Sequence, residues 1–218
     1  MPDDRNASAR CLCEQTLESA VRELSQRDRM LDAIVHSCGP PPLWGRDADF
    51  STLIRIILEQ QVSLASAKAA FNRLLSSVDS LAPERFLLLD DETLKSIGFS
   101  RQKSGYGRNL ARAIVEGDLE LDALQGMDDE QVRRKLTAIK GIGTWTADIF
   151  LLMALRRPDI WPMGDLALAI AIQHLTERDN RPTQEEIDRL SELWKPWRAV
   201  AARLLWHYYL SRIARVSG

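Results

Sequence analysis

Apolar residues recur at spacings of three and four along almost the whole chain, which is the pattern of amphipathic helices. No segment alternates apolar and polar residues over a useful length, and the sequence contains neither an Asn-Gly nor an Asp-Gly hairpin pair. The pattern predicts an all-α protein of roughly ten or more short helices, too short and too many for a simple bundle. The expected helices lie at residues 17–24, 30–35, 53–58, 64–75, 83–89, 91–97, 100–116, 130–139, 144–155, 166–175, 187–193 and 198 to about 216.

Residues that favour helix ends occur where these segments begin and stop. Ser63, Asp128 and Asp165 each precede an expected helix and suit the N-cap, where a side-chain oxygen accepts a free backbone N–H. Residues 183–186 read Thr-x-x-Glu, a capping box. The Gly-Pro-Pro-Pro run at 39–42 ends the second helix, because proline lacks the N–H donor.

Composition excludes two classes of protein. With 45% hydrophobic and 28% charged residues, the chain can bury a core and is not expected to be disordered. No apolar run approaches the roughly 18 residues that a membrane span needs, and the first ten residues lack the apolar core of a signal peptide. We therefore expect a cytoplasmic protein, nucleoid-associated if bacterial, whose three cysteines are reduced thiols.

Charge is balanced overall but unevenly distributed. The net charge is −2, so global charge gives no indication of a nucleic-acid partner. Residues 95–115 and 194–218 each carry five cations and no acid. Either stretch taken alone is typical of a solvated helix face, but two of them favour a basic surface.

The first motif with chemical content spans residues 136–147, Leu-x-x-Ile-Lys-Gly-Ile-Gly-Thr-x-Thr-Ala. Its glycines permit a tight turn and a close approach of phosphate to the backbone, and the next helix offers free N–H groups to that anion. An ordinary tight turn is the alternative, which the length of the pattern disfavours. The candidate phosphate-binding residues are Lys140, Gly141, Ile142, Gly143, Thr144 and Thr146.

The second motif is Asp165, which follows a Gly- and Pro-containing loop one helix after the hairpin. An aspartate in this place is commonly an N-cap. A capping carboxylate can also face a ligand, so a chain that binds a DNA phosphate at the hairpin could use Asp165 near the sugar.

The hairpin, helix, loop and aspartate together resemble the helix-hairpin-helix DNA glycosylase superfamily, and within it the 3-methyladenine DNA glycosylase II group, which removes alkylated bases. Two further stretches support the resemblance, which covers about residues 15–215. Residues 57–63 are similar to the DNA-intercalating loop of the family, and residues 194–198 with Trp206 are similar to its C-terminal helix.

The resemblance implies one glycosylase domain in two lobes, with the active site in the cleft between them. One lobe holds about residues 50–157, and the other about 1–49 with 158–218. A monomer that acts on damaged double-stranded DNA is expected. Asp165 would stabilise the oxocarbenium ion and direct a water, while Gln60 and Gln61 would fill the gap left by the flipped base. The expected base pocket comprises Trp44, Trp145, Ile149 and Trp206, whereas Trp161, Trp194 and Trp197 are expected to be structural.

Departures from the family pattern refine these expectations. Trp145 stands where bifunctional relatives carry a lysine nucleophile, so a Schiff base and strand cleavage are not expected. Ile149 replaces an aromatic residue and puts the substrate range in question. No catalytic cofactor is implied, although the family suggests a structural Na⁺ or K⁺ on the carbonyls of Thr137, Ile139 and Ile142. Asp148 is expected to face solvent.

Three alternatives remain open at this point. The same fold serves glycosylases for mismatched or oxidised bases, and the absence of the lysine argues only against lyases. A non-catalytic damage sensor would use the hairpin without Asp165. A helical protein-interaction domain would leave the two hairpin glycines unexplained.

Overall fold

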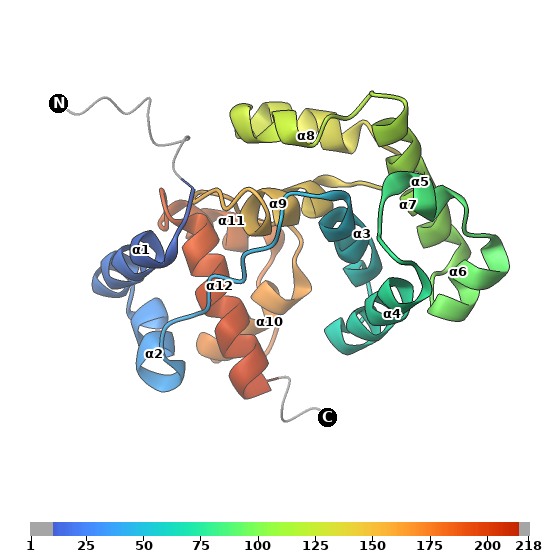
Figure 1. Ribbon diagram of the computed structural model, residues 1–218. Coiled ribbons are helices and arrows are strands. Elements are labelled where there is room, and N and C mark those ends of the chain that lie inside the picture. Colours follow the sequence, from blue (N-terminus) through green and yellow to red (C-terminus); the bar gives the residue numbers. More distant parts are fainter. Residues whose placement is uncertain (1–10, 214–218) are drawn as a thin grey trace. The chain divides into compact units, whose positions relative to one another are not determined.

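The computed structural model describes residues 11–213, and every regular element in that range is helical (Figure 1). This confirms the predicted all-α class. Within the described residues, no helix combines the length and apolar character needed to cross a bilayer. The N-terminal ten residues, examined above for a signal peptide, lie outside the described part.

The chain divides into two compact units. The continuous unit runs from Arg46 to Leu155, and the discontinuous unit joins the residues up to Gly45 with those from Arg156 onward. The continuous unit contains α3 (Phe50–Glu59), α4 (Leu64–Ser77), α5 (Pro83–Leu87), α6 (Asp91–Ile97), α7 (Arg101–Val115), the 3₁₀ helix η2 (Asp122–Gly126), α8 (Asp129–Thr137) and α9 (Thr144–Met153). The discontinuous unit contains α1 (Glu14–Arg27), α2 (Arg29–Cys38), α10 (Leu166–Leu175), α11 (Gln184–Glu192), α12 (Arg198–Tyr208) and the π-helical turn η3 (Tyr209–Ile213).

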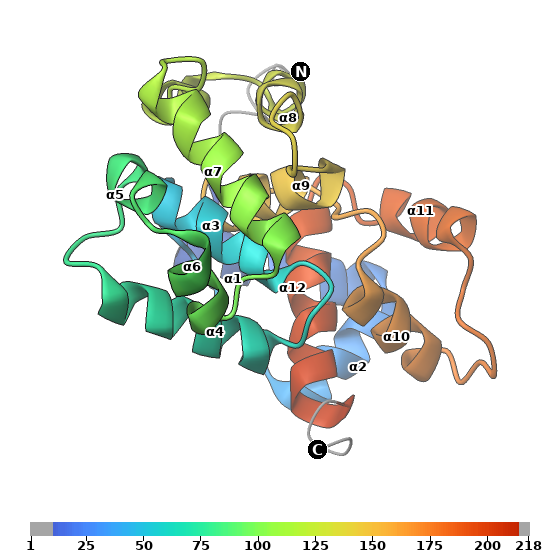
Figure 2. The same ribbon diagram turned by 90° about the vertical axis from the view of Figure 1, so that its right-hand side faces the viewer.

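Helix α3 forms the centre of the continuous unit, where it packs against α4, α7 and α9 (Figure 2). Seven of its ten residues are buried. A helix that is apolar on nearly all sides must be enclosed by others, because burying its surface supplies the main stabilising free energy. The end of α3 is thereby held firmly at the turn that carries Gln60 and Gln61.

Helix α12 has the same role in the discontinuous unit. It packs against α1, α2 and α10 (Figure 1), and eight of its eleven residues are buried. One of them is Arg203, whose Nε donates to the carbonyl of Leu43 at 2.8 Å and whose Nη1 donates to the carbonyl of Ala199 at 3.0 Å. Burial lowers the pKa of Arg203 to about 9. The guanidinium thus ties the Pro-rich loop at 39–45 to α12.

The helix starts predicted from capping residues are confirmed. Ser63, Asp128, Asp165 and Thr183 each accept a backbone N–H in the first turn that follows. The ends differ more. The last helix was expected to reach about residue 216, but α12 ends at Tyr208 and the chain continues as a π-helical turn, and residues 214–216 lie outside the described part.

The expectation that Asp148 faces solvent is wrong. Its side chain is 2% exposed and accepts a hydrogen bond from Nε of Arg133 at 2.6 Å, which joins α9 to α8. Burial opposes the charge on Arg133, but bonds to Asp148 and Glu130 raise its pKa above the usual value. The error arose because α9 has no polar face: eight of its ten residues are buried.

Several cations of the two basic stretches form bonds within the protein. In the first, Lys103 and Arg108 bind backbone carbonyls of the continuous unit, at 2.7 Å and 2.9 Å. In the second, Arg198 forms an ion pair with Asp159 at 2.9 Å and Arg203 is buried. These cations hold the fold together, because their donors satisfy carbonyl and carboxylate acceptors that would otherwise lack partners.

Candidate functional site

The hairpin is a tight turn between α8 and α9. The N–H of Ile142 donates to the carbonyl of Ile139 at 3.0 Å, and the Ile142 side chain is 4% exposed. Gly141 has φ of +107°, a left-handed conformation that favours glycine. Gly143 is the N-cap of α9, so the first N–H groups of that helix lack partners within the helix. The turn therefore has the geometry of an anion site at a helix N-terminus.

Helix α7 supports the hairpin turn through two of its side chains. A Cβ built on Gly141 would lie 2.1 Å from the ring of Tyr106, so the turn rests directly on that ring. One turn further along α7, the amide of Asn109 donates to the carbonyl of Lys140 at 3.1 Å. A Cβ on Gly143 meets nothing within 4 Å. Gly141 is thus required by packing, whereas Gly143 leaves open space beside the backbone.

The turn after α3 is tied to the same hairpin. The side-chain amide of Gln60 donates to the carbonyl of Gly141 at 3.1 Å and to Oγ1 of Thr146 at 2.9 Å. Gln61, by contrast, is exposed and has φ of +54°. Of the two glutamines expected to act as the wedge, Gln60 is therefore bonded within the protein and Gln61 projects from it.

Asp165 begins α10 as its N-cap. Its Oδ1 accepts from the backbone N–H of Leu168 at 3.1 Å and from the indole N–H of Trp206 at 3.1 Å. Two donors on one oxygen fix the orientation of the carboxylate. The side chain is half-buried and so is not sealed in the core. The carboxylate is held in a defined direction at a partly open position.

The remaining predicted aromatic residues lie in both units. Trp44 has φ of +50°, and its ring centroid is 6.3 Å from that of His207, the residue after Trp206. Trp145 and Ile149 lie one turn apart on α9, where Trp145 is half-buried and Ile149 is 3% exposed. The other tryptophans are bonded or packed within the discontinuous unit. The ring centroids of Trp161 and Trp194 lie 5.3 Å apart. The indole N–H of Trp194 donates to Asp28, and that of Trp197 donates to Glu23.

The structure thus brings the predicted residues into two clusters. The discontinuous unit unites Asp165 with Trp206, and the continuous unit unites the wedge turn with the hairpin. Sequence reasoning missed three residues of the second cluster, Lys103, Tyr106 and Asn109. Their spacing of three along a helix, which places them on one face, is the signal that could have revealed them.

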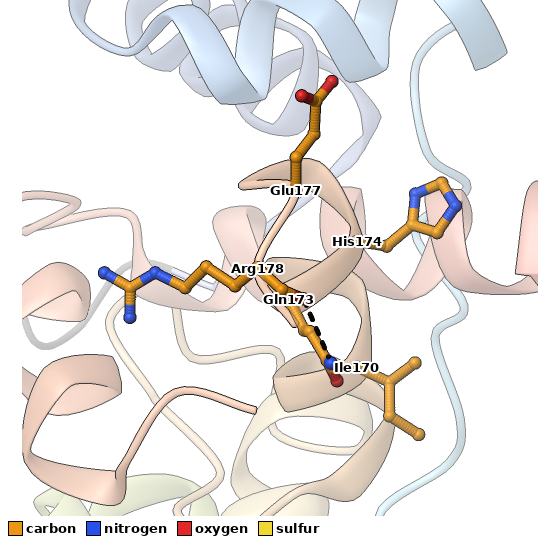
Figure 3. A pocket seen from close by; sticks show the side chains of 5 residues that line it. All are labelled: Ile170, Gln173, His174, Glu177 and Arg178. Carbon is orange, nitrogen blue, oxygen red and sulfur yellow. Dashed lines mark hydrogen bonds between the residues drawn. The ribbon is translucent and has the colours of Figure 1, made fainter. Parts of the chain in front are cut away.

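One surface hollow of about 420 Å³ lies elsewhere, at the C-terminal end of α10. Figure 3 shows its lining side chains, with Arg178 and His174 pointing to opposite sides of the helix end. Gln173 is bonded to the carbonyl of Arg178 at 3.2 Å, and His174 to the hydroxyl of Tyr208 at 2.8 Å. Because these groups do not converge, the hollow offers no built site for a ligand.

The sequence of this chain matches a known protein family. The family model described as HhH-GPD superfamily base excision DNA repair protein matches residues 54–196. The chain is 29% identical over 187 residues to DNA-3-methyladenine glycosylase 1 of Schizosaccharomyces pombe, covering 84% of this chain and 82% of that protein. It is 30% identical over 184 residues to YfjP of Bacillus subtilis, of whose length it spans 64%.

Solved structures show the same likeness. The 3-methyladenine DNA glycosylase Mag1 of Schizosaccharomyces pombe, in complex with abasic DNA, matches with a TM-score of 0.84 at 28% identity, over 89% of this chain and 98% of that one. A DNA-3-methyladenine glycosidase from Bacillus halodurans matches with a TM-score of 0.70 at 27% identity, over 93% of this chain and 92% of that one. The fold, the hairpin and the matched family model lead to one conclusion: this chain belongs to the HhH-GPD superfamily of base excision DNA repair proteins.

Proposed function

We propose that this protein is a monofunctional DNA glycosylase that removes alkylated purines, such as 3-methyladenine and 7-methylguanine, from double-stranded DNA by hydrolysis. The observation that carries the proposal is the Asp165 carboxylate, held by Leu168 and Trp206 at the start of α10 in a protein of the base excision repair superfamily. The names of the relatives, 3-methyladenine glycosylases from yeast and bacteria, support the choice of substrate.

Asp165 supplies the charge that the reaction needs. As the base leaves, the bond from C1′ to the base nitrogen breaks and positive charge develops on the sugar. A fixed carboxylate stabilises that charge and orients a water, which attacks C1′ and gives up a proton. An alkylated purine leaves as a neutral base because it already carries positive charge, so the reaction does not require a strong general acid.

The indole rings account for the choice of alkylated bases. A cationic or electron-poor purine stacks on an electron-rich ring with a gain of about 0.5–2 kcal/mol from cation–π attraction. Trp206 contacts Asp165 directly, and Trp145 is half-buried at the start of the hairpin's second helix. Each of these two, and Trp44, offers an indole ring on which a flipped base can stack.

The hairpin and the wedge turn provide DNA binding. The N–H groups at the start of α9 and the exposed Lys140 bind a backbone phosphate, and Gln61 fills the space left in the duplex. We also propose that the carbonyls of Thr137, Ile139 and Ile142 hold a structural Na⁺ or K⁺, as the resemblance to the family implies. Ile139 uses its carbonyl for the turn, but a carbonyl oxygen has a second lone pair for a cation. Such an ion would add positive charge beside the phosphate.

The test is base release from a set of duplexes, each with one defined lesion. We expect release of 3-methyladenine and 7-methylguanine and little release from duplexes with 8-oxoguanine or a mismatched thymine. Release only from oxidised or mismatched duplexes would replace the alkylated-base assignment. Tight binding of lesions without release of any base would indicate a damage sensor.

Substitution of Gly143 by alanine tests the phosphate site without disturbing the fold. Gly143 has an ordinary φ of −91°, and a Cβ there meets no protein atom within 4 Å. The methyl group should therefore crowd the phosphate and weaken binding of damaged and undamaged duplexes alike, because phosphate contacts carry no sequence information. Thermal unfolding should be unchanged. If only lesion-containing DNA bound more weakly, the hairpin would not be the phosphate anchor.

Strand cleavage should be absent. A lyase requires an amine that attacks C1′ and forms a Schiff base, and the indole nitrogen of Trp145 is not a nucleophile. Incubation of an alkylated duplex with the protein and borohydride should give no covalent adduct, and the strand should break only after alkali. A trapped adduct, or nicking without alkali, would falsify the monofunctional assignment.

A further inference from the structure

The turn between α3 and α4 is held by a residue from another helix. Lys103, on α7, donates from Nζ to the carbonyls of Leu58 and Gln60, each at 2.7 Å. The last carbonyls of a helix lack partners within the helix, and a cation there also interacts favourably with the helix dipole. The ammonium therefore fixes the backbone where α3 ends and the turn begins.

Gln60 is bound from both of its ends. Lys103 holds its carbonyl, and its side-chain amide donates to the hairpin at Gly141 and Thr146. The next residue, Gln61, has a left-handed backbone with φ of +54°, a conformation that is unfavourable for a residue with a side chain. Such a conformation persists only where its surroundings hold it in place.

The same face of α7 also supports the hairpin. Tyr106 lies against Gly141, and Asn109 donates to the carbonyl of Lys140 at 3.1 Å. Lys103, Tyr106 and Asn109 are spaced by three and so lie on one face of the helix. One helix face thus holds two loops that are far apart in the sequence.

Lys103 is also set apart from the surface lysines by its surroundings. It is half-buried, and desolvation lowers the pKa of its ammonium group below the usual value. Placing an ammonium in such a position costs free energy, which the two short bonds to carbonyl oxygens offset. A surface lysine that only attracted DNA would not need this arrangement.

We propose that Lys103 is a positioning residue that holds the Gln60–Gln61 turn against the hairpin, so that Gln61 is oriented for insertion when the hairpin binds phosphate. This rests on the proposed function, because insertion has a purpose only if a base leaves the stack. Phosphate binding and wedge insertion would then be joined through one helix face.

The central variant is Lys103→Met, which keeps an unbranched side chain one atom shorter and removes the donor. Lys103→Arg restores a cationic donor, and Lys68→Met, on the exposed side of α4, removes the same charge in the same unit. Each protein is bound to a duplex in which 2-aminopurine lies opposite a tetrahydrofuran abasic analogue. Its fluorescence reports insertion at the gap and requires no base release. Affinity for undamaged duplex, thermal unfolding and single-turnover release of 7-methylguanine are measured beside it.

We expect Lys103→Met to bind undamaged duplex as the wild type does, and to lose most of the fluorescence change. Single-turnover release should fall by about tenfold, because the two charge-assisted hydrogen bonds that hold the turn in its reactive geometry are lost. Lys103→Arg should recover most of both signals, and Lys68→Met should match the wild type.

Several results would overturn the inference. One is a normal fluorescence change in Lys103→Met. Another is that Lys103→Met loses affinity equally for all duplexes and Lys103→Arg does not restore it. Lys103 would then serve only to stabilise the fold. If Lys103→Met does not fold, Gln60→Met answers the question, because it breaks the other half of the same connection, and normal insertion by that variant would refute the proposal. The wild type could show the fluorescence change and Lys103→Met lose it, while the wild type releases no base. That result would contradict the proposed function alone.

Discussion

Asp165→Asn should bind damaged DNA almost as well as the wild type and release its base at least about 100-fold more slowly, the loss seen when one fixed group that stabilises transition-state charge is removed. Asparagine has nearly the same size, and its Oδ1 can still accept the N–H groups of Leu168 and Trp206. The fold and the N-cap should survive while the negative charge is lost. Single-turnover release of 7-methylguanine, with duplex affinity and thermal unfolding beside it, measures each part separately.

The chain itself offers a closely matched control in Asp28. That residue is the N-cap of α2, accepts from Met30 and Leu31, and also accepts an indole N–H, that of Trp194 at 2.8 Å. Its bonds use both oxygens, Oδ1 for Met30 and Leu31 and Oδ2 for Trp194, so the amide NH₂ of Asp28→Asn must face one of these N–H donors. We therefore expect Asp28→Asn to destabilise the fold more than Asp165→Asn does, with normal base release by the folded protein.

The comparison of the two variants decides the mechanism. Equal loss of activity in both would assign the effect to helix capping rather than to the carboxylate charge. Near-normal release by a folded Asp165→Asn protein would remove Asp165 from the reaction and leave the glycosylase without its proposed electrostatic group.

Asp148→Ala should lower the free energy of unfolding by about 3–5 kcal/mol, the range for breaking a buried ion pair by removal of one partner. The carboxylate is 2% exposed and holds Arg133 at 2.6 Å, so its loss leaves a cation beside a small cavity. Urea unfolding measures the change. We expect base release at low temperature to persist in the fraction that remains folded, because Asp148 has no role in the proposed reaction.

An Arg–Asp pair whose aspartate is exposed provides the comparison in the same unit. Asp91 bonds Arg108 at 2.5 Å, but its side chain is 78% exposed. Asp91→Ala should cost no more than about 1 kcal/mol, because water screens exposed pairs. Adding Arg133→Met to Asp148→Ala should recover part of the loss, since it removes the cation that has lost its buried partner. Equal unfolding costs for the two aspartate variants would contradict the role of Asp148 as a buried link between α8 and α9.

Local signals in the sequence were sufficient for the helices and their starts. A cap acts within three residues, so Ser63, Asp128, Asp165 and Thr183 could be assigned without knowledge of the fold. The hairpin was equally local, because its two glycines and apolar neighbours lie in one short stretch. The aspartate after the Pro-containing loop was found in the same way, and its N-cap geometry agrees with the prediction.

Contacts between distant residues could not be obtained in this way. Asp148 was misjudged because α9 is apolar on nearly all sides, so the sequence held no polar face against which to orient the carboxylate. The bond from Trp206 to Asp165 joins residues 41 apart, and the bond from Lys103 to Leu58 joins residues 45 apart.

The sequence by itself determined that this protein is helical, where most helices begin, and which turn and which carboxylate are the candidates for its chemistry, because capping and turn formation act between neighbouring residues. Only the tertiary structure decided what those groups are bonded to. Gln60 is bonded to the hairpin, and Lys103 supports the wedge turn. Asp148, which was expected to face solvent, is buried. The physical reason is that a buried donor or acceptor must find a partner wherever packing has placed one, and packing unites residues that no local pattern connects.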